Sequence, residues 1–342
     1  MRIKINGKWF AFFDDISVSY KLDSIASTFS FKTRFNPDNA DHREIFRPLA
    51  YNTVEIFDNN EILLFTGTSL MTSLSSAKDR SLQTVAGYSR AGVLEDSSIP
   101  YNAYPLEKNN VSLQDIVEVL LRDFDISYFI DPSASVDMGL VYKKTTATPS
   151  ESIKNYIAKL AAQRNIILSH DARGSLLFIK PGFDALPKLF LNETNTVAIT
   201  TKVNGQAMHS TITVIRQPDK DNTSIEPVDT INNSLIGINR TITKVLSSGQ
   251  ETATKKAADN VLAEELKNIS INARLKRIED VKVGETVEVL SPENFIFERA
   301  KLVVVAVNIK ENNSVEEMSL DLVLPETFTG QDPKNIFNYV DV

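Results

Sequence analysis

The sequence of 342 residues contains no cysteine. Disulfide bonds, zinc sites built from thiolates and a cysteine nucleophile are therefore excluded together. Histidine is also scarce, and the chain has three: His42, His170 and His209. They show neither HExxH spacing nor a second histidine within one helical turn, so they do not converge as metal ligands must. We expect no metal and no cofactor.

The motifs of common enzyme classes are missing as well. With 12 glycines, the chain has neither a GxGxxG nor a GxxxxGK phosphate loop. The segment Gly87–Gly92 is one residue too long for the GxSxG turn that presents a serine nucleophile. Carboxylates in turns are mostly solvated, whereas glycoside chemistry needs two of them set across a cleft. The acidic clusters lie in predicted turns: Asp14-Asp15, Glu95-Asp96, and Asp219 with Asp221. We therefore expect no catalytic residues and no enzymatic activity.

Long apolar runs and an excess of basic charge are also lacking. The longest apolar run, Leu302 to Val307, is far shorter than the ~20 residues that span a bilayer. The run from Trp9 to Phe13 is shorter than the roughly 7–15 residues of a signal-peptide core. The net charge of -7 offers no basic surface for phosphates. We expect a protein that folds in a cytoplasm, without membrane insertion and without sequence-specific nucleic-acid binding.

The first part of the chain has the alternation of apolar and polar residues that is typical of half-buried strands. It is clearest in residues 16–22 and 28–35. Further strands are predicted at 53–57, 62–65, 69–74 and 81–88. Asp58-Asn59-Asn60 supplies residues that tolerate a positive φ, so it predicts a hairpin turn. Short strands at this spacing indicate a small barrel or sandwich.

The middle of the chain changes to helical periodicity. The segment from Ser112 to Phe124 has a helical apolar stripe, and Ser112 with Asp115 predicts a capping pair at its start. For a second helix we expect Thr148 as N-cap, with Pro149 as the first helical residue. Strands at 166–168 and 176–179 flank a hairpin at 171–174. This region is predicted to be α+β.

After residue 189 the β pattern returns. Strands are predicted at 196–203 and 211–216, a third helix at 252–269 with Ile269 on its inner face, and more strands from 275 to 324. The stretch that starts at Thr53 has a parallel in the stretch that starts at Thr286: strand, turn, strand and a further strand. Each follows a pair of alternating strands, 16–22 with 28–35 and 196–203 with 211–216. The two readings of this parallel are an internal repeat and a chance likeness of β meanders.

The predicted fold class is mainly β with an α+β insertion: two similar small β-barrel domains, an α+β domain and a helical insertion. The predicted boundaries are 1–95 for the first barrel, 96–187 for the α+β domain, 188–246 with 275–325 for the second barrel, 247–274 for the helical insertion and 326–342 for a C-terminal tail. The tail has two readings, as a docking segment for a partner or as a segment packed on its own domain. Its candidate partner-binding residues are Phe328, Ile336, Phe337 and Tyr339.

Several short segments stand in an order that is typical of one protein family. They are Ile5-Asn6-Gly7-Lys8, Phe65-Thr66-Gly67, Gly87 to Arg90, Val93 to Ser98, the helix after Ser112, the helix entered at Thr148, Leu177 to Gly182, and Leu322 to Pro325. With this order the chain resembles the baseplate hub proteins of Mu-type contractile-tailed phages. That family is related to the late-control D family and to the hub-like part of type VI secretion spikes. The chain departs from it in a less arginine-rich helix at 252–269 and in its short length.

The resemblance implies a structural function. Such hubs have two similar barrels in one chain, and three copies form a ring of six barrels that joins a three-fold central spike to a six-fold tail tube. The implied partners are a homotrimer, the spike protein, the tail tube protein and baseplate wedge proteins, with DNA passing through the channel. The implied location is the virion baseplate, assembled in the host cytoplasm. The alternative is a tail-associated cell-wall hydrolase or carbohydrate-binding tail protein, which a zymogram on peptidoglycan tests.

Overall fold

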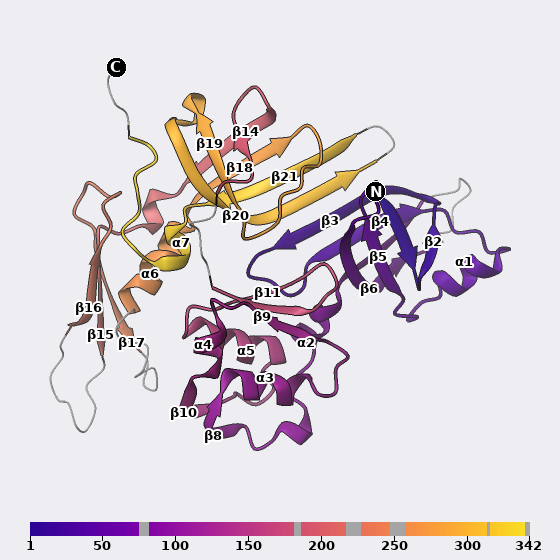
Figure 1. Ribbon diagram of the computed structural model, residues 1–342, viewed down its shortest axis with the longest axis horizontal. Helices are drawn as coiled ribbons and strands as arrows, with labels where there is room; N and C mark the ends of the chain where they lie inside the picture. Colours follow the sequence, from indigo (N-terminus) through magenta and orange to yellow (C-terminus); the bar gives the residue numbers. More distant parts are fainter. Residues whose placement is uncertain (75–81, 181–185, 217–226, 247–256, 313–314, 339–342) are drawn as a thin grey trace. The chain divides into compact units, whose positions relative to one another are not determined.

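The computed structural model describes residues 1–74, 82–180, 186–216, 227–246, 257–312 and 315–338 (Figure 1). It is mainly β, with 44% strand and 21% helix. The chain divides into two compact units, which we call unit 1 (Met1–Lys180 with Ala306–Met318) and unit 2 (Pro181–Val305 with Ser319–Val342). Among the described helices, none combines the length and the apolar character needed to cross a membrane.

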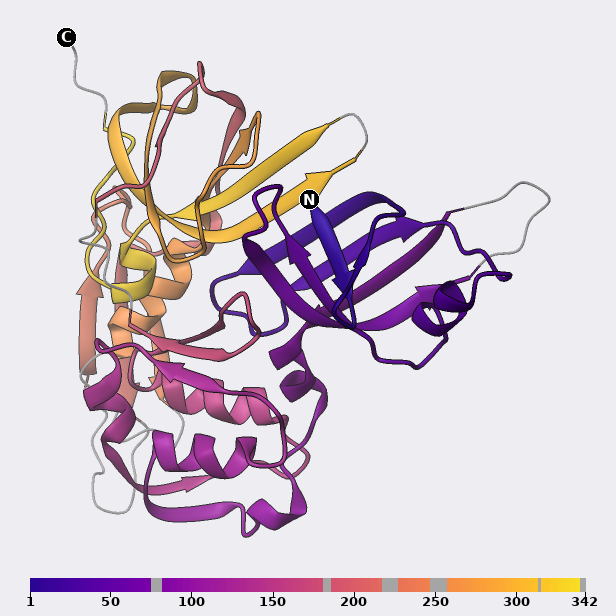
Figure 2. The ribbon, with the colours of Figure 1, turned by 45° about the vertical axis from the view of Figure 1, so that its right-hand side comes forward.

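Unit 1 begins with a curled sheet (Figure 2). Its strands are β1 (Arg2–Ile5), β2 (Lys8–Phe10), β3 (Phe13–Lys21), β4 (Thr28–Thr33), β5 (Thr53–Phe57), β6 (Leu63–Ser73) and β7 (Gln83–Ser89), in the order β3-β4-β7-β6-β5-β1-β2. The short helix α1 (Ala40–Ile45) precedes β5. Alternate residues of these strands are buried, as the period-two pattern predicts. Their buried core includes Ile16, Val18, Phe29, Phe31, Val54, Ile56, Phe65 and Val85.

The predicted turn at 58–60 is confirmed, because the Asp58 carboxylate accepts hydrogen bonds from the backbone N–H groups of Asn60 and Ile62. The prediction of separate strands at 62–65 and 69–74 is wrong. They form one strand, β6, with a bulge between Ser69 and Met71. A bulge inserts one residue and keeps the strand paired, so the broken alternation does not mark an end.

The remainder of unit 1 is an α+β layer below the curled sheet in Figure 1. Its helices are α2 (Val93–Asp96), α3 (Leu113–Leu121), α4 (Ser135–Gly139) and α5 (Ile153–Ala162). Its strands are β8 (Glu107–Ser112), β9 (Tyr128–Ile130), β10 (Val141–Thr146), β11 (Ile167–His170) and β12 (Leu176–Ile179). β8 pairs with β10, while β12 pairs antiparallel with β11 and parallel with β9. The apolar stripes of α3 and α5 meet in one core with Leu168, Leu176 and Phe178.

The two predicted helix starts in this layer have different outcomes. At α3 the capping box is confirmed: Ser112 Oγ accepts from Asp115 N at 3.1 Å, and the Asp115 carboxylate accepts from Ser112 N at 2.8 Å. At α5 the prediction of Thr148 as N-cap is wrong, because the N-cap is Ser152. Ser150 has a φ of 64°, which no α-helix continues through, so the helix begins only after it.

Unit 2 contains β13 (Phe190–Leu191), β14 (Thr196–Val203), β15 (Thr211–Arg216), β16 (Pro227–Asn232), β17 (Thr241–Leu246), α6 (Ala257–Leu266), β18 (Ile269–Leu275), β19 (Thr286–Ser291), β20 (Ile296–Glu311), β21 (Glu316–Val323) and α7 (Glu326–Thr329). The predicted pair 196–203 with 211–216 is corrected: β14 pairs with β18, whereas β15 lies in a separate sheet between β16 and β17. Ile269 begins strand β18 and is not part of a helix; residues 252–256 of the predicted helix lie outside the described ranges.

The second and third strands predicted in the stretch that starts at Thr286 are likewise one strand, β20, of 16 residues. Its residues Ile296–Val305 belong to unit 2, and its residues Ala306–Glu311 belong to unit 1, where they pair antiparallel with β3. β20 is therefore a strand of both units.

The strand order repeats along the chain. In the first stretch the order is β3-β4-β7-β6-β5, and in the second it is β14-β18-β21-β20, with β19 on β20. Each stretch is thus five strands in which the first pairs with the second, the second with the fifth, the fifth with the fourth and the fourth with the third. We call these stretches repeat 1 (β3 to β7) and repeat 2 (β14 and β18 to β21). In repeat 2, residues 204–268 intervene between the first and second strands.

Candidate interaction surfaces

The three histidines lie in separate local environments. His42 is in α1, where its Nδ1 accepts from Asn36 N at 3.2 Å. His170 is buried at the end of β11, where its Nδ1 lies 2.8 Å from the carbonyl oxygen of Asp171, and burial lowers the pKa of its imidazole. His209 Nδ1 lies 2.7 Å from Glu265 Oε1. Within the described ranges, no group of three or more side chains is arranged to hold a metal ion.

The acidic clusters hold structural contacts. Asp15 forms an ion pair with Lys32 across β3 and β4, and Glu95 forms one with Lys154 at 3.2 Å. The Asp96 carboxylate accepts from the Tyr88 hydroxyl at 2.8 Å; burial, followed by this bond, raises the pKa of Tyr88 to about 12. Asp219 and Asp221 lie outside the described ranges.

The segment Gly87–Gly92 runs from the end of β7 through a 3-10 turn, Arg90–Gly92, that precedes α2. Ser89 is fully buried, and its hydroxyl donates to the carbonyl oxygen of Ile25. A serine in this position ties the end of β7 to the connection between β3 and β4 and does not face a substrate. The segment therefore lacks the exposed Oγ that a nucleophile elbow requires.

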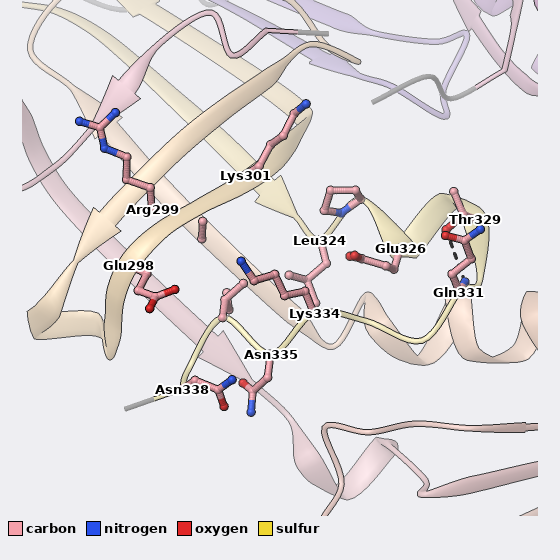
Figure 3. Close-up of a pocket in the computed structure, with 13 residues that line it drawn as sticks. Glu298, Arg299, Lys301, Leu324, Glu326, Thr329, Gln331, Lys334, Asn335 and Asn338 are labelled. Carbon is pink, nitrogen blue, oxygen red and sulfur yellow. Dashed lines mark hydrogen bonds between the residues drawn. The ribbon is translucent and has the colours of Figure 1, made fainter. Parts of the chain in front are cut away.

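A cavity of about 530 Å³ lies between β20 and the C-terminal segment in unit 2 (Figure 3). Its charged side chains come from β20, from α7 and from the segment after it: Glu298, Arg299, Lys301, Glu326 and Lys334. Figure 3 shows Glu326 and Lys334 extending into the space between β20 and the tail. Glu326 Oε2 is buried, and it has no hydrogen-bond partner among the described residues. The Arg299 side chain makes a cation–π contact, with its Cζ 4.5 Å from the centroid of the Phe190 ring.

The predicted partner-binding residues of the tail lie close to this cavity. Phe328 is half-buried in α7, Ile336 lines the cavity, and Phe337 is half-buried. Tyr339 lies outside the described ranges. The structure thus brings two of the four, Ile336 and Phe337, together in the segment after α7, and their binding of a partner stays a prediction.

The tail is anchored on its own unit. Asp332 accepts from Ser234 N at 2.8 Å, and the Pro333 carbonyl oxygen accepts from the Ser234 hydroxyl at 3.3 Å. Gly330, with a φ of 67°, lies so close to Asp259 in α6 that a Cβ would come within 2.2 Å of the Asp259 carbonyl oxygen. These contacts favour the reading of the tail as a segment packed on its own domain.

Two separate sheet edges, one in each unit, are further candidate surfaces, which the sequence did not single out. Among the described residues, β14 pairs with one strand only, β18. The second half of β6 pairs with β7 on one side and, within the described part of the chain, with no strand on the other. Apolar side chains are exposed on both: Met71 is 71% exposed and Val203 is 54% exposed. Unpaired edges of this kind are templates for pairing with another chain.

Comparison with known proteins shows which family and which solved structures this architecture is similar to. Residues 91–180 match the family described as baseplate hub protein gp44-like, second domain. No curated protein matches the sequence. Solved structures with a similar fold include a 43 kDa tail protein of prophage MuSo2 from Shewanella oneidensis, at 17% identity and a TM-score of 0.77, covering 96% of this chain and 97% of that one. A tail protein from Neisseria meningitidis MC58 is similar at 15% identity and a TM-score of 0.77, with the same coverage.

A third similar structure comes from a secretion system. The Escherichia coli c3393 protein is described as a component of the type VI secretion system with structural similarity to bacteriophage T4 tail proteins. It matches at 12% identity and a TM-score of 0.57, over 100% of this chain and 80% of that one. Residues 91–180 are therefore similar to the second domain of gp44-like baseplate hub proteins, the whole chain has a fold like that of these tail proteins, and the predicted resemblance to baseplate hub proteins is confirmed.

Proposed function

We propose that this protein is the structural hub of a phage tail baseplate, and that three copies form a ring of pseudo-six-fold symmetry. The duplicated strand order of repeats 1 and 2 is the observation that carries the proposal. Because each chain contains two similar repeats, a trimer of the chain contains six similar repeats. Such a ring can meet a three-fold partner on one side and a six-fold partner on the other.

The partners follow from that symmetry. The three-fold side suits a central spike protein, the six-fold side suits the tail tube protein, and the outer wall is left for baseplate wedge proteins. In this arrangement each repeat belongs to a small barrel, the first within residues 1–95 and the second formed by β14 and β18 to β21. The α+β domain at 96–187, residues 204–268 between β14 and β18, and the tail at 326–342 lie outside the barrels. The complex belongs to the virion baseplate and assembles in the host cytoplasm.

The channel of the ring lets DNA pass. A wall that holds phosphates tightly would retard sliding, since each phosphate contact adds to affinity. The net charge of -7 agrees with a channel wall that binds phosphates weakly. The hydroxyl groups of Ser17 in β3 and Ser30 in β4 are hydrogen-bonded at 2.8 Å, and the charges of Asp15 and Lys32 on the same strands offset one another in an ion pair.

The oligomeric state tests the proposal. Light scattering of the purified full chain should give three times the mass of one 38.1 kDa chain, and negative-stain images should show a central channel. A chain that stays monomeric at high concentration, both alone and with the spike protein, contradicts the proposal.

We also propose that the tail segment with Ile336 and Phe337 contacts a partner in the baseplate. Deletion of residues 330–342 should then leave the trimer intact and weaken its binding to the spike or tube protein. The double variant Ile336→Ser and Phe337→Ser is the milder change, because it keeps the Ser234 contacts of Asp332 and Pro333. Unchanged binding of both partners by the double variant contradicts a docking role for these side chains.

A further inference from the structure

One edge of β20 extends beyond its neighbouring strand. β20 has 16 residues, whereas β21, the strand on that edge, has eight. The turn between them is closed by a hydrogen bond from Asn312 N to the Val315 carbonyl oxygen at 3.0 Å. Counted back from this turn, the residues of β21 end near Val304. The stretch from Glu298 to Lys301 therefore has, among the described strands, no partner on this edge.

Lys301 directs its backbone groups to this free edge. Val304 donates from its N–H to the Glu285 carbonyl oxygen at 2.9 Å and accepts from Gly284 N at 2.8 Å, so its backbone groups lie on the β19 edge. The pairing of β20 with β19 is regular from Ala300 to Val303. Backbone groups alternate between the two edges along a strand, so those of Lys301 point away from β19. In the described part of the chain, no hydrogen bond joins them to the tail.

The cavity of about 530 Å³ lies along this free edge (Figure 3), and we call it the β20 slot. Its opposite wall is the tail segment from Gln331 to Asn338. That segment is held in place by the hydrogen bonds of Asp332 and Pro333 with Ser234. An unused strand edge on one side and an anchored chain segment on the other form a site of the kind that receives one extended strand.

A buried carboxylate oxygen faces the β20 slot. Figure 3 shows Glu326 extending into it, and the Oε2 atom of Glu326 is buried without a hydrogen-bond partner among the described residues. Lys334 extends into the same space, yet within the described ranges it does not pair with this oxygen. A buried polar atom without a partner costs free energy, and a positively charged donor satisfies a carboxylate oxygen best.

We propose that the β20 slot binds an extended segment of another protein, which adds a strand to the free edge of β20 and places a lysine side chain against Glu326. The backbone of the segment hydrogen-bonds to Lys301, and its lysine ammonium donates to Glu326 Oε2. A single unpaired oxygen suits the compact charge of an ammonium, whereas a guanidinium fork suits two oxygens. The inference rests on the proposed function for the source of the segment, a baseplate partner, and it names the site and the chemistry of the contact.

Only an extended segment with a lysine accounts for both features of the slot. A small free cation satisfies Glu326 and leaves the backbone groups of Lys301 unused. A wholly apolar strand uses those backbone groups and leaves the Glu326 oxygen unpaired.

Zero-length cross-linking tests the contact. The full chain is mixed in turn with the purified spike, tube and wedge proteins and treated with a carbodiimide, which joins a carboxylate to an amine that touches it. Mass spectrometry should find an amide bond between Glu326 and a lysine of one partner. Glu326→Gln should abolish this bond. The matched control is Glu293→Gln, the same change at an exposed residue of the 3-10 turn Pro292–Asn294, and it should preserve the bond.

The same two variants separate a binding role from a structural one. Because Glu326 Oε2 has no partner in the described part of the free chain, Glu326→Gln should leave the urea midpoint of that chain unchanged. It should weaken binding of the cross-linked partner by about thirtyfold, the effect of removing one member of a buried charge pair. Glu293→Gln should change neither quantity. A lower midpoint with unchanged binding would assign Glu326 a structural role and overturn the inference.

Hydrogen exchange at single amides tests the added strand. When the partner binds, the amide of Lys301 gains a backbone acceptor and should exchange about tenfold more slowly. The amide of Leu302 is the internal control, because it points to β19 and should exchange at the same rate with and without the partner.

The outcomes separate the inference from the proposed function. A Glu326 cross-link together with slower exchange at Lys301 supports the inference and identifies the partner. A partner that binds and gives only one of these results, or neither, overturns the inference while the proposed function stands. A cross-link from Glu326 to a second copy of this chain also overturns it. If none of the three proteins binds, the inference fails, and the mass from light scattering decides the proposed trimer separately.

Discussion

At the scale of single residues, two glycines set the distance between β6 and β7. A Cβ on Gly87 would lie 1.9 Å from the Thr68 carbonyl oxygen, and a Cβ on Gly67 would lie 2.3 Å from the Tyr88 carbonyl oxygen. Because the obstacles are backbone atoms, a side chain cannot be accommodated by a rotamer change. The sequence showed these glycines only as part of short segments, because the clash depends on a strand that lies elsewhere in the chain.

We therefore expect Gly87→Ala to lower the free energy of unfolding by about 3 kcal/mol, the upper range for overpacking of a closed structure. Urea unfolding followed by circular dichroism measures the change. Gly139→Ala is the matched control, because nothing lies within 4 Å of its Cβ position. Equal effects of the two substitutions would contradict the argument from close approach.

His170 makes stability depend on pH. Burial lowers the pKa of its imidazole below the usual 6.5, so the unfolded chain binds the proton more readily than the folded chain does. Its contribution to stability is fully present above about pH 6.5 and is lost as the pH falls toward the lower folded pKa. We expect His170→Asn, which keeps a donor for the Asp171 carbonyl, to lose less stability than the wild type between pH 7.5 and pH 5. The same loss in both chains would contradict this assignment.

At the scale of elements, the capping box of α3 is the feature that sequence and structure define in the same way. Ser112 and Asp115 bond reciprocally across the first turn, and the Ser112 hydroxyl is the main cause of a lowered pKa at Asp115. Ser112→Ala should lower the free energy of unfolding by about 1 kcal/mol. Ser135→Ala in α4 is the control, since the cap of that helix has no side-chain hydrogen bond. A loss as large in the control would count against a capping effect.

Local patterns predicted most elements and misjudged their continuity. Alternation located β3, β4 and β5, because one face of each is buried. It divided β6 and β20 in two, because the non-apolar residues 66–68 interrupt the apolar pattern of β6 and the exposed residues Glu298 and Arg299 interrupt that of β20. The repeat was visible in the same stretches, but its first pair was misassigned, because β14 finds its partner β18 across 65 intervening residues (204–268).

The candidate surfaces were predictable only in part. The aromatic and apolar residues of the tail stand out in the sequence, and Ile336 does line a cavity. The edges of β6 and β14 do not stand out, because being unpaired is a property of strand order and not of composition. Exposed Val203 looks in sequence like any core residue of a strand.

At the scale of the whole molecule, β20 couples the stability of the two units. Its residues Ala306–Glu311 pair with β3 within unit 1, and unfolding of unit 2 would free the other end of the same strand, so we expect one cooperative transition. The single tryptophan, Trp9 in β2, reports on unit 1 by fluorescence, whereas far-UV circular dichroism reports on both units. The two urea curves should coincide, and Val18→Ala in β3 should shift them together. Separate midpoints would contradict the coupling.

The pairing of β3 with β20 also determines where the proposed ring of three chains could break. Of the six seams of such a ring, three would be closed within a chain as soon as that chain folds, and they would survive any dilution. The other three would close only when neighbours meet. Dilution of the proposed ring would therefore release whole chains, each contributing one third of the ring.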